Sequence, residues 1–88
     1  MTALEVTLLT QDACGFCDDA KAILDRLADD HPIRVVELDL GTDEGRQLAE
    51  RSGVLFPPGI LFDGDPISYG RPSERRLRKE LRRRLDGR

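Results

Sequence analysis

The stretch LEVTLLTQDACGFCDDAKAILDRLADD, residues 4–30, decides the fold. Its beginning alternates apolar and polar side chains, which predicts a β-strand over residues 4–9. Further on, apolar residues recur every three or four positions, which predicts a helix over residues 14–30. The expected members of this apolar stripe are Phe16, Ala20, Ile23, Leu24 and Leu27. The change of period falls at Cys14 and Cys17, so both cysteines are placed where a strand gives way to a helix.

The next part of the chain predicts another strand and another helix. The first helix is expected to end at His31-Pro32, because proline forces the residue before it out of the helical region. Residues 33–40 then have the pattern of a strand. Its apolar side chains are Val35, Val36, Leu38 and Leu40. Thr42 is expected to cap a short helix that ends at Ser52, with Gly53 as its C-terminal cap.

The last third of the chain predicts a hairpin and a closing helix. Apolar runs over residues 59–62 and 67–69 flank the segment Asp-Gly-Asp-Pro, and an Asp-Gly step between such runs favours a tight turn. Ser73 is expected to cap a helix whose leucines repeat every four residues. The predicted order, β-α-β-α-β-β-α, indicates an α/β fold in which a four-stranded mixed sheet is flanked by three helices.

Length and composition favour a single domain, residues 1–88, in the cytoplasm. One core of this size uses nearly all the apolar residues that the chain supplies, so no second domain is expected. The longest apolar stretches are far shorter than the roughly 20 residues that a membrane-spanning helix needs. The N-terminal residues also lack the basic region of a secretion signal. We therefore expect a cytoplasmic protein without a membrane segment.

Cys14 and Cys17 have the spacing of a redox-active pair beside a β-α-β unit. Unpaired N–H groups and the helix dipole stabilise an anion at a helix N-terminus, so the thiol pKa of Cys14 is expected below the ordinary value of about 8.5. The nearby carboxylates of Asp12, Asp18 and Asp19 oppose ionisation, which limits this effect. We predict that Cys14 is the catalytic nucleophile and that Cys17, one turn further on, is the resolving thiol.

Two other interpretations of the cysteine pair remain open. A structural zinc site needs four ligands, and the chain offers only Cys14, Cys17 and His31, so a dimer would have to complete it. We expect no metal site. A purely structural disulfide is the second alternative, but a bridge between residues three positions apart closes too small a loop to constrain the unfolded chain strongly.

Pro57-Pro58 and Phe16 are candidates for a substrate-binding surface. Proline is the residue for which a cis peptide bond costs little, and the Pro57–Pro58 bond is expected to be cis. Its backbone would then lie against the cysteines and pair with a bound substrate; a rigid trans turn is the alternative. Phe16 either offers an apolar contact beside the sulfur or simply packs against the core.

With these residues together, the chain resembles a glutaredoxin-like member of the thioredoxin superfamily over nearly its whole length. Residues 6–17 are similar to the family's first strand and active-site loop, Asp63-Gly64 to its hairpin, and Pro58 stands at its cis-proline position. The resemblance implies the thioredoxin fold and a thiol–disulfide oxidoreductase that serves electron transport and cell redox homeostasis. The thioredoxin branch looks less similar, because Leu8 and Ala13 stand where it has a buried acid and a tryptophan.

The resemblance also suggests further binding residues and an electron donor. Gln11 stands where glutathione-using glutaredoxins carry a lysine, and residues 68–72 are similar to redoxins that accept electrons from thioredoxin reductase. Tyr69, Arg71 and Ser73 join the predicted substrate site; Arg71 and Ser73 either hold a substrate carboxylate or are a surface arginine and a helix cap. No bound cofactor is required. The expected donor is glutathione, another low-molecular-weight thiol or thioredoxin reductase, and the expected substrate is a disulfide-containing protein or small molecule.

The rival interpretation is a non-enzymatic module of the same fold. Cys-Gly-Phe also occurs in monothiol glutaredoxins, which bind a [2Fe–2S] cluster between two subunits with the help of glutathione. Here the second cysteine is present and the lysine is absent, which favours the dithiol enzyme. The non-enzymatic alternative could also be a protein-interaction module that uses the basic C-terminal segment instead of an iron–sulfur carrier.

Charge is unevenly distributed along the sequence. The net charge is −3, but residues 1–70 carry −9 and residues 71–88 carry +6. The cations of this basic segment are Arg71, Arg75, Arg76, Arg78, Lys79, Arg82, Arg83, Arg84 and Arg88. No aromatic residues interleave with them, so we do not expect nucleic-acid binding. We expect a monomer whose last helix is neutralised by acids of the first, namely Asp18, Asp25, Asp29 and Asp30.

Overall fold

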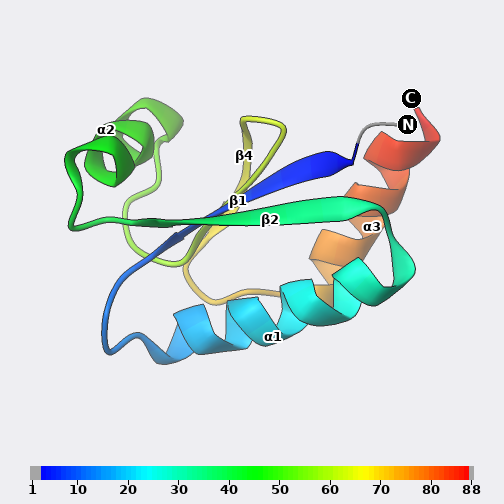
Figure 1. The fold of residues 1–88 in the computed structure, drawn as a ribbon, viewed down its shortest axis with the longest axis horizontal. Helices are drawn as coiled ribbons and strands as arrows, with labels where there is room; N and C mark the ends of the chain where they lie inside the picture. The colour runs from blue at the N-terminus through cyan, green and yellow to red at the C-terminus, as the bar shows by residue number, and fades with distance from the viewer. Residues whose placement is uncertain (1–2, 88) are drawn as a thin grey trace.

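The computed structural model describes residues 3–87 and contains the elements in the predicted order (Figure 1). They are β1 (Leu4–Thr10), α1 (Gly15–Asp30), β2 (Ile33–Asp39), α2 (Asp43–Ser52), β3 (Gly59–Phe62), β4 (Asp65–Tyr69) and α3 (Glu74–Asp86). The four strands form one sheet in the order β2-β1-β3-β4. β1 runs parallel to β2 and antiparallel to β3, and β4 is antiparallel to β3. The predicted mixed sheet and three helices are therefore confirmed. None of the helices between residues 3 and 87 is long and apolar enough to cross a membrane.

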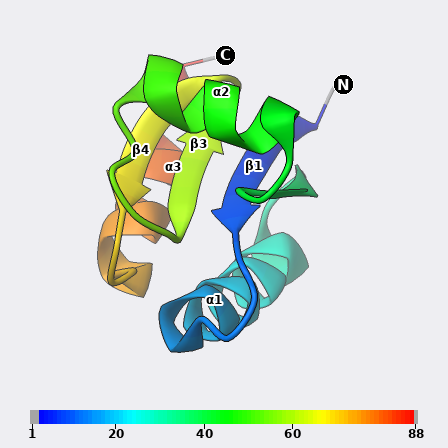
Figure 2. The same cartoon turned by 90° about the vertical axis from the view of Figure 1, so that its left-hand side faces the viewer.

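The sheet separates two hydrophobic clusters. α1 and α3 cover one face, and α2 lies over the other (Figures 1 and 2). The larger cluster, under α1 and α3, contains Leu4, Val6, Leu8, Ala20, Ile23, Leu24, Leu27, Ile60, Phe62, Leu77 and Leu81. The smaller one, under α2, contains Leu9, Ala49, Val54 and Leu61. Because side chains alternate along a strand, β1 and β3 each supply residues to both clusters.

Each helix begins with a side chain that caps its N-terminus. The hydroxyls of Thr42 and Ser73 accept a hydrogen bond from the amide three residues further on, at 3.0 and 3.3 Å, as the sequence predicts. α1 begins at Gly15, one residue later than predicted, so Cys14 is its cap. Gly53 ends α2 with φ of +76°, the left-handed conformation that favours glycine at this position.

The hairpin between β3 and β4 turns over two residues only. Asp63 and Gly64 both have positive φ, 47° and 87°, as a two-residue turn between twisted strands requires. Strand β4 therefore starts at Asp65, two residues before the predicted position. A pair of hydrogen bonds joins Asp63 to Glu5 and ties the turn to the start of β1.

Val35 and Val36 are two of the apolar residues expected in β2, and both lie at the surface. Their side chains are 37% and 39% exposed. β2 lies at the edge of the sheet, so it has a neighbouring strand on one side only, and the buried strand residues of both clusters come from β1 and β3. The charged residues beside the valines form ion pairs, Arg34 with Glu5 and Glu37 with Lys21.

The buried stripe of α1 also differs by one member from the predicted stripe. Phe16 is 46% exposed, whereas Cys17 is only 1% exposed. A stripe that begins at either residue has helical spacing with Ala20, so periodicity alone does not choose between them. Phe16 is consequently a surface residue, and Cys17 faces the core.

Candidate active site

Cys14 and Cys17 form a disulfide at the start of α1, with their Cα atoms 5.2 Å apart. Cys14 has an extended backbone and is partly exposed, and its sulfur accepts a hydrogen bond of 3.1 Å from the Cys17 amide. Cys17 is buried. A substrate approaching from outside therefore reaches the sulfur of Cys14 first, which is the arrangement that a nucleophile and a resolving thiol require.

The backbone changes direction sharply just before this pair. Ala13 has φ of +54°, a left-handed conformation that costs a residue with a Cβ about 1–2 kcal/mol. The chain leaves β1 at Thr10 and reaches the first turn of α1 five residues later. This turn directs the N–H groups of α1 toward Cys14, where they stabilise a developing thiolate.

The Pro57–Pro58 peptide bond is cis, as the sequence predicts. Leu9 pairs with Gly59, and Gly59 pairs with Tyr69, so the proline pair and the end of β4 lie at the same end of the sheet as the exit of β1 (Figure 2). Gly70 donates a hydrogen bond of 2.9 Å to the carbonyl of Pro58. The carbonyl of Pro58 is thus engaged within the chain.

An exposed apolar group surrounds this end of the sheet. The rings of Phe56 and Tyr69 meet edge to face with their centroids 5.1 Å apart. Gly70, with φ of +80°, lies so close to the Phe56 ring that a Cβ there would be 2.6 Å from it. The exposed apolar residues of this end are Phe16, Leu55, Phe56 and Tyr69. Sequence reasoning missed Leu55 and Phe56, although two apolar residues directly before the proline pair were a usable signal.

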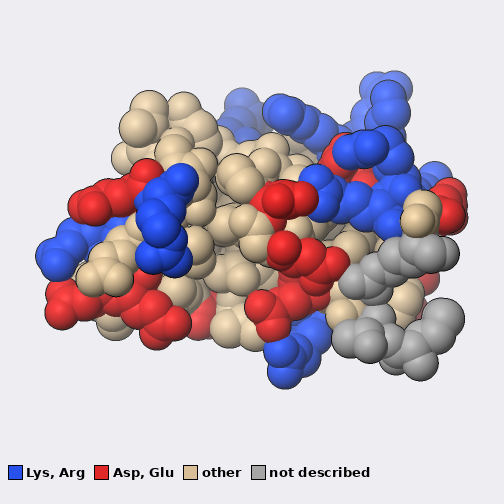
Figure 3. All heavy atoms as spheres, turned by 90° about the horizontal axis from the view of Figure 1, so that it is seen from above, with Lys and Arg blue, Asp and Glu red and all other residues tan. Residues whose placement is uncertain are grey.

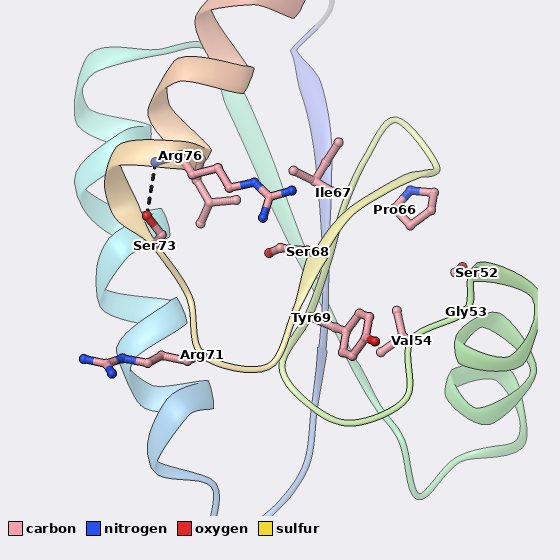
Figure 4. Close-up of a pocket in the computed structure, with 11 residues that line it drawn as sticks. Ser52, Gly53, Val54, Pro66, Ile67, Ser68, Tyr69, Arg71, Ser73 and Arg76 are labelled. Carbon is pink, nitrogen blue, oxygen red and sulfur yellow. Dashed lines mark hydrogen bonds between the residues drawn. The ribbon is translucent and has the colours of Figure 1, made fainter.

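The other predicted binding residues are spread over this end of the molecule. Gln11 lines a hollow of about 300 Å³ with Asp12, Lys21 and Glu37 among its neighbours. The Ser73 hydroxyl caps α3, which agrees with the interpretation as a helix cap. Figure 4 shows the Arg71 side chain pointing toward α1 and that of Tyr69 toward Val54. Tyr69, Arg71 and Ser73 line one hollow beside β4, whereas Gln11 lies in a different one.

The candidate metal ligands do not come together. His31 follows α1 at its C-terminal end, and a helix of 16 residues separates it by roughly 24 Å from the cysteines at the other end. Within residues 3–87, no group of three or more His, Cys, Asp or Glu side chains is arranged to hold a metal ion. A zinc site made of Cys14, Cys17 and His31 in one chain is therefore geometrically impossible.

Carboxylates neutralise part of α3, but most are not the predicted ones. Asp30 pairs with Arg78 at 3.0 Å. Asp18, Asp25 and Asp29, in contrast, form no ion pair within residues 3–87; the pairs that join α1 to α3 use Arg26 and Asp30. The remaining pairs join Arg26 and Arg78 to Glu74, Arg83 and Arg84 to Glu80, and Arg84 to Asp65, while Arg88 lies outside the described residues.

Ion pairing lowers the pKa values of two half-buried carboxylates of α3. The hydrogen bond from Arg26 holds the pKa of Glu74 below its ordinary value, with a further contribution from Arg78. Arg83 lowers the pKa of Glu80 in the same way. Other cations have no such partner within residues 3–87: Arg71, Arg75, Arg76, Lys79 and Arg82. Figure 3 shows cations gathered toward the end of the molecule where α3 lies.

The sheet order, the two helices on one face and the disulfide at the start of α1 together define a redoxin of the thioredoxin fold. Residues 5–82 match the model of the glutaredoxin-like domain family (DUF836), and the chain belongs to this family. The expected resemblance is thereby confirmed.

Known relatives and structures agree with this class. Thioredoxin from Methanocaldococcus jannaschii is 27% identical over 85 residues, which cover 97% of this chain and 100% of that protein. NADPH-dependent thioredoxin reductase 3 from Arabidopsis thaliana is 29% identical over 79 residues, or 88% of this chain but 15% of that protein. A mutant thioredoxin from Halobacterium salinarum has the same fold, with a TM-score of 0.72 and 23% identity over 93% of this chain and 74% of that one. Family and disulfide together support a thiol–disulfide redox function.

Proposed function

We propose that the protein is a dithiol oxidoreductase that reduces disulfides of proteins or small molecules through Cys14 and Cys17. The observation that carries this proposal is the disulfide at the start of α1, in which Cys14 is partly exposed and Cys17 is buried. Cys14 caps α1 and Cys17 lies in its first turn, so the helix start holds the two cysteines close enough to form a disulfide. The N–H groups of the first turn favour the thiolate over the thiol at Cys14.

The reaction proceeds in two exchanges. The Cys14 thiolate attacks one sulfur of the substrate disulfide, so a mixed disulfide forms and the other substrate sulfur leaves as a thiolate. Cys17, after losing its proton to solvent, attacks the Cys14 sulfur. The Cys14–Cys17 disulfide then forms, the second substrate thiol is released, and two electrons have passed to the substrate. A donor thiol pair reverses these steps on the enzyme.

The apolar residues around the cysteines supply the substrate surface in this proposal. Phe16 follows Cys14 by two residues and is largely exposed, and Tyr69 lies with Phe56 at the same end of the sheet. Pro57 has no N–H group, so only its carbonyl is available to pair with a substrate backbone. Gln11, Pro58, Arg71 and Ser73 complete the proposed substrate-binding set.

The proposed reaction needs a donor of electrons that reduces the Cys14–Cys17 disulfide again. Glutathione, another small thiol or thioredoxin reductase would return electrons to the pair, and no resident cofactor is needed. The partial match to a plant thioredoxin reductase supports a reductase-linked donor. We further propose that the protein acts as a monomer in the cytoplasm.

A turnover assay on a model disulfide tests the proposal. The full chain is supplied either with glutathione or with thioredoxin reductase and NADPH, and thiol release is followed with time. We expect turnover with at least one donor, none for Cys14→Ser, and a trapped mixed disulfide for Cys17→Ser, detected by mass spectrometry. Turnover that survives Cys14→Ser contradicts the proposal, as does its absence with both donors; a brown dimer on purification would indicate an iron–sulfur carrier instead.

The pH dependence of Cys14 alkylation tests the electrostatic part of the proposal. Helix N–H groups lower the thiol pKa, and the carboxylates of Asp12, Asp18 and Asp19 limit the effect. We expect the rate of iodoacetamide reaction with the reduced protein to rise with a midpoint between about 6 and 8.5. A midpoint below about 5 would show that the nearby carboxylates do not have this influence.

A further inference from the structure

A hollow of about 310 Å³ lies beside β4, a strand at the edge of the sheet (Figure 4). Its walls are the end of α2 with Val54, strand β4 from Pro66 to Tyr69, and the first turn of α3 with Arg76. A second hollow of about 210 Å³ shares Pro66, Ile67 and Arg76 with the first. Arg76 therefore stands between two parts of one groove that follows β4.

Ser68 places an unsatisfied hydroxyl in the wall of this groove. Within residues 3–87 its oxygen is the one buried side-chain polar atom without a hydrogen-bond partner. The pairing of β3 with β4 shifts between Ile60 and Leu61, so Ile67 is an extra residue and Ser68 faces Ile60, on the side of α3. Figure 4 shows the Ser68 side chain pointing toward α3. A buried hydroxyl that lacks a partner lowers stability, so such groups are rare unless water or a ligand satisfies them.

Arg76 is the matching group on the opposite wall. Its side chain extends from α3 toward β4 in Figure 4. Arg78, Arg83 and Arg84 of the same helix all form ion pairs, whereas Arg76 has none within the described part of the chain. Arg71 also borders the hollow, but its side chain points away from it. The groove thus holds one free guanidinium and one free hydroxyl on facing elements.

We propose that this groove binds a small organic anion whose acid group pairs with Arg76 and whose polar substituent hydrogen-bonds Ser68. A carboxylate or phosphate matches the fork of a guanidinium, and Ile67 and Val54 offer contacts to an apolar part. The hollow has the volume of the smaller ligand pockets, about 300 Å³, which suits a metabolite. The excess positive charge of residues 71–88 attracts anions to this side. The hollow shares Tyr69, Arg71 and Ser73 with the proposed redox substrate surface, but the two groups proposed to hold the anion, Arg76 and Ser68, are not part of that set.

The edge of β4 is not suited to the alternative occupant, an added peptide strand. Pro66 has no N–H group to offer, and the extra residue Ile67 interrupts the regular spacing of the remaining donors and acceptors. A strand from another protein would find an incomplete hydrogen-bonding edge. A small molecule needs only the two side-chain groups.

Titration of the oxidised full chain with glutarate and, separately, with inorganic phosphate tests the site by two-dimensional ¹H–¹⁵N NMR. We expect saturable shifts of the Ser68 amide and the Arg76 side-chain Nε–H group, half complete below about 10 mM for at least one probe. Arg76→Gln should weaken binding by about tenfold or more. Arg82→Gln, which removes an exposed cation of α3 that lines neither hollow, should change it less than twofold. Equal shifts at Arg75, Lys79 and Arg82, or no saturation with either probe, would overturn the proposal.

Ser68→Ala gives a second test with two readouts of opposite sign. Removal of a buried unpaired hydroxyl should raise the midpoint of thermal unfolding by roughly 4–8 °C. The same change should weaken probe binding about threefold or more, because the ligand loses a partner. A lower midpoint would show that the hydroxyl is already satisfied, and unchanged binding would show that it does not contact the ligand; either result contradicts the role of Ser68.

Discussion

The first turns of α1 and α3 share one capping geometry but differ in chemistry. In α1 the Cys14 sulfur accepts a hydrogen bond from the amide three residues further on, at 3.1 Å, and in α3 the Ser73 hydroxyl does the same at 3.3 Å. The residue that donates is Cys17 in one case and Arg76 in the other. The helix start is thus a common structural device, and only the sulfur atoms make one of the two a candidate redox centre.

The largest expected effect is the loss of activity in Cys14→Ser. Serine caps a helix well, so the start of α1 should stay intact while the nucleophile is lost. We expect disulfide reductase activity to fall at least about a thousandfold, with the free energy of unfolding within about 0.5 kcal/mol of the reduced wild type. Ser73→Cys is the matched control, because it adds a thiol at the equivalent cap without a resolving partner. Activity of the double variant Cys14→Ser, Ser73→Cys would remove the proposed distinction between the two helix starts.

A stability loss of about 2 kcal/mol is expected for Gly70→Ala, in the segment that leads into α3. The alanine would have to adopt a φ of +80°, and its Cβ would lie 2.6 Å from the Phe56 ring. Gly64→Ala is the control, since it has φ of +87° with nothing within 4 Å and should cost only about 1 kcal/mol. Urea unfolding of both variants gives the comparison. Equal losses would mean that the Phe56 ring moves aside freely.

Ser73→Ala is expected to cost about 1 kcal/mol, because it leaves the Arg76 amide without its acceptor. Ser73→Asp should restore the cap, with a carboxylate that the positive end of the helix dipole favours. Chemical unfolding curves at pH 7 measure both. If Ser73→Ala leaves the free energy of unfolding unchanged, the capping hydrogen bond of α3 contributes little to stability. The starts of α1 and α3 would then share a geometry but not an energetic role.

A smaller change of opposite sign is expected for Ala13→Gly at the entry to α1. Ala13 has φ of +54°, which glycine adopts without strain. The greater freedom of glycine in the unfolded chain offsets part of this gain, so stability should rise by up to about 1 kcal/mol. Thermal unfolding of the oxidised protein checks the sign. A clear loss of stability would show that this turn is not strained.

The smallest expected effect concerns the acid side of the stability curve. The pKa of Glu74 is lowered in the folded state by its hydrogen bond to Arg26. Its stabilising contribution is therefore present above the pKa of the unfolded chain and is lost as pH falls through the folded pKa. Glu74→Gln should make unfolding less dependent on pH below about pH 5, by a small amount because the pair is exposed. If the pH dependence of unfolding is the same in the variant, the pair of Arg26 and Glu74 does not contribute to acid stability.

Local signals in the sequence predicted the helix starts well. Ser73 and Thr42 are capping residues followed by helical periodicity, and the positions of Cys14 and Cys17 follow from the same local rule. The Pro57–Pro58 isomer was also predictable, because few other residues tolerate it. These features depend on a few neighbouring residues, which is why one sequence suffices to find them.

Features that depend on contacts between distant segments were not predictable. Val35 and Val36 have the composition of a core strand, but burial depends on whether helices cover that position of the sheet. The partners of the α3 arginines depend on how far α1 and α3 run side by side. The orientation of Ser68 results from one extra residue in β4, and no pattern in the neighbouring sequence predicts that extra residue.

The open edge of β2 has a consequence for how copies of this chain meet in concentrated solution. Val35 and Val36 on a strand with one free edge would suit intermolecular stacking of the amyloid kind. Arg34 and Glu37 flank them, and each already binds a counter-charge within its own chain. A molecule adding its strand here would have to strip water from both charged side chains, a desolvation cost that opposes fibre growth.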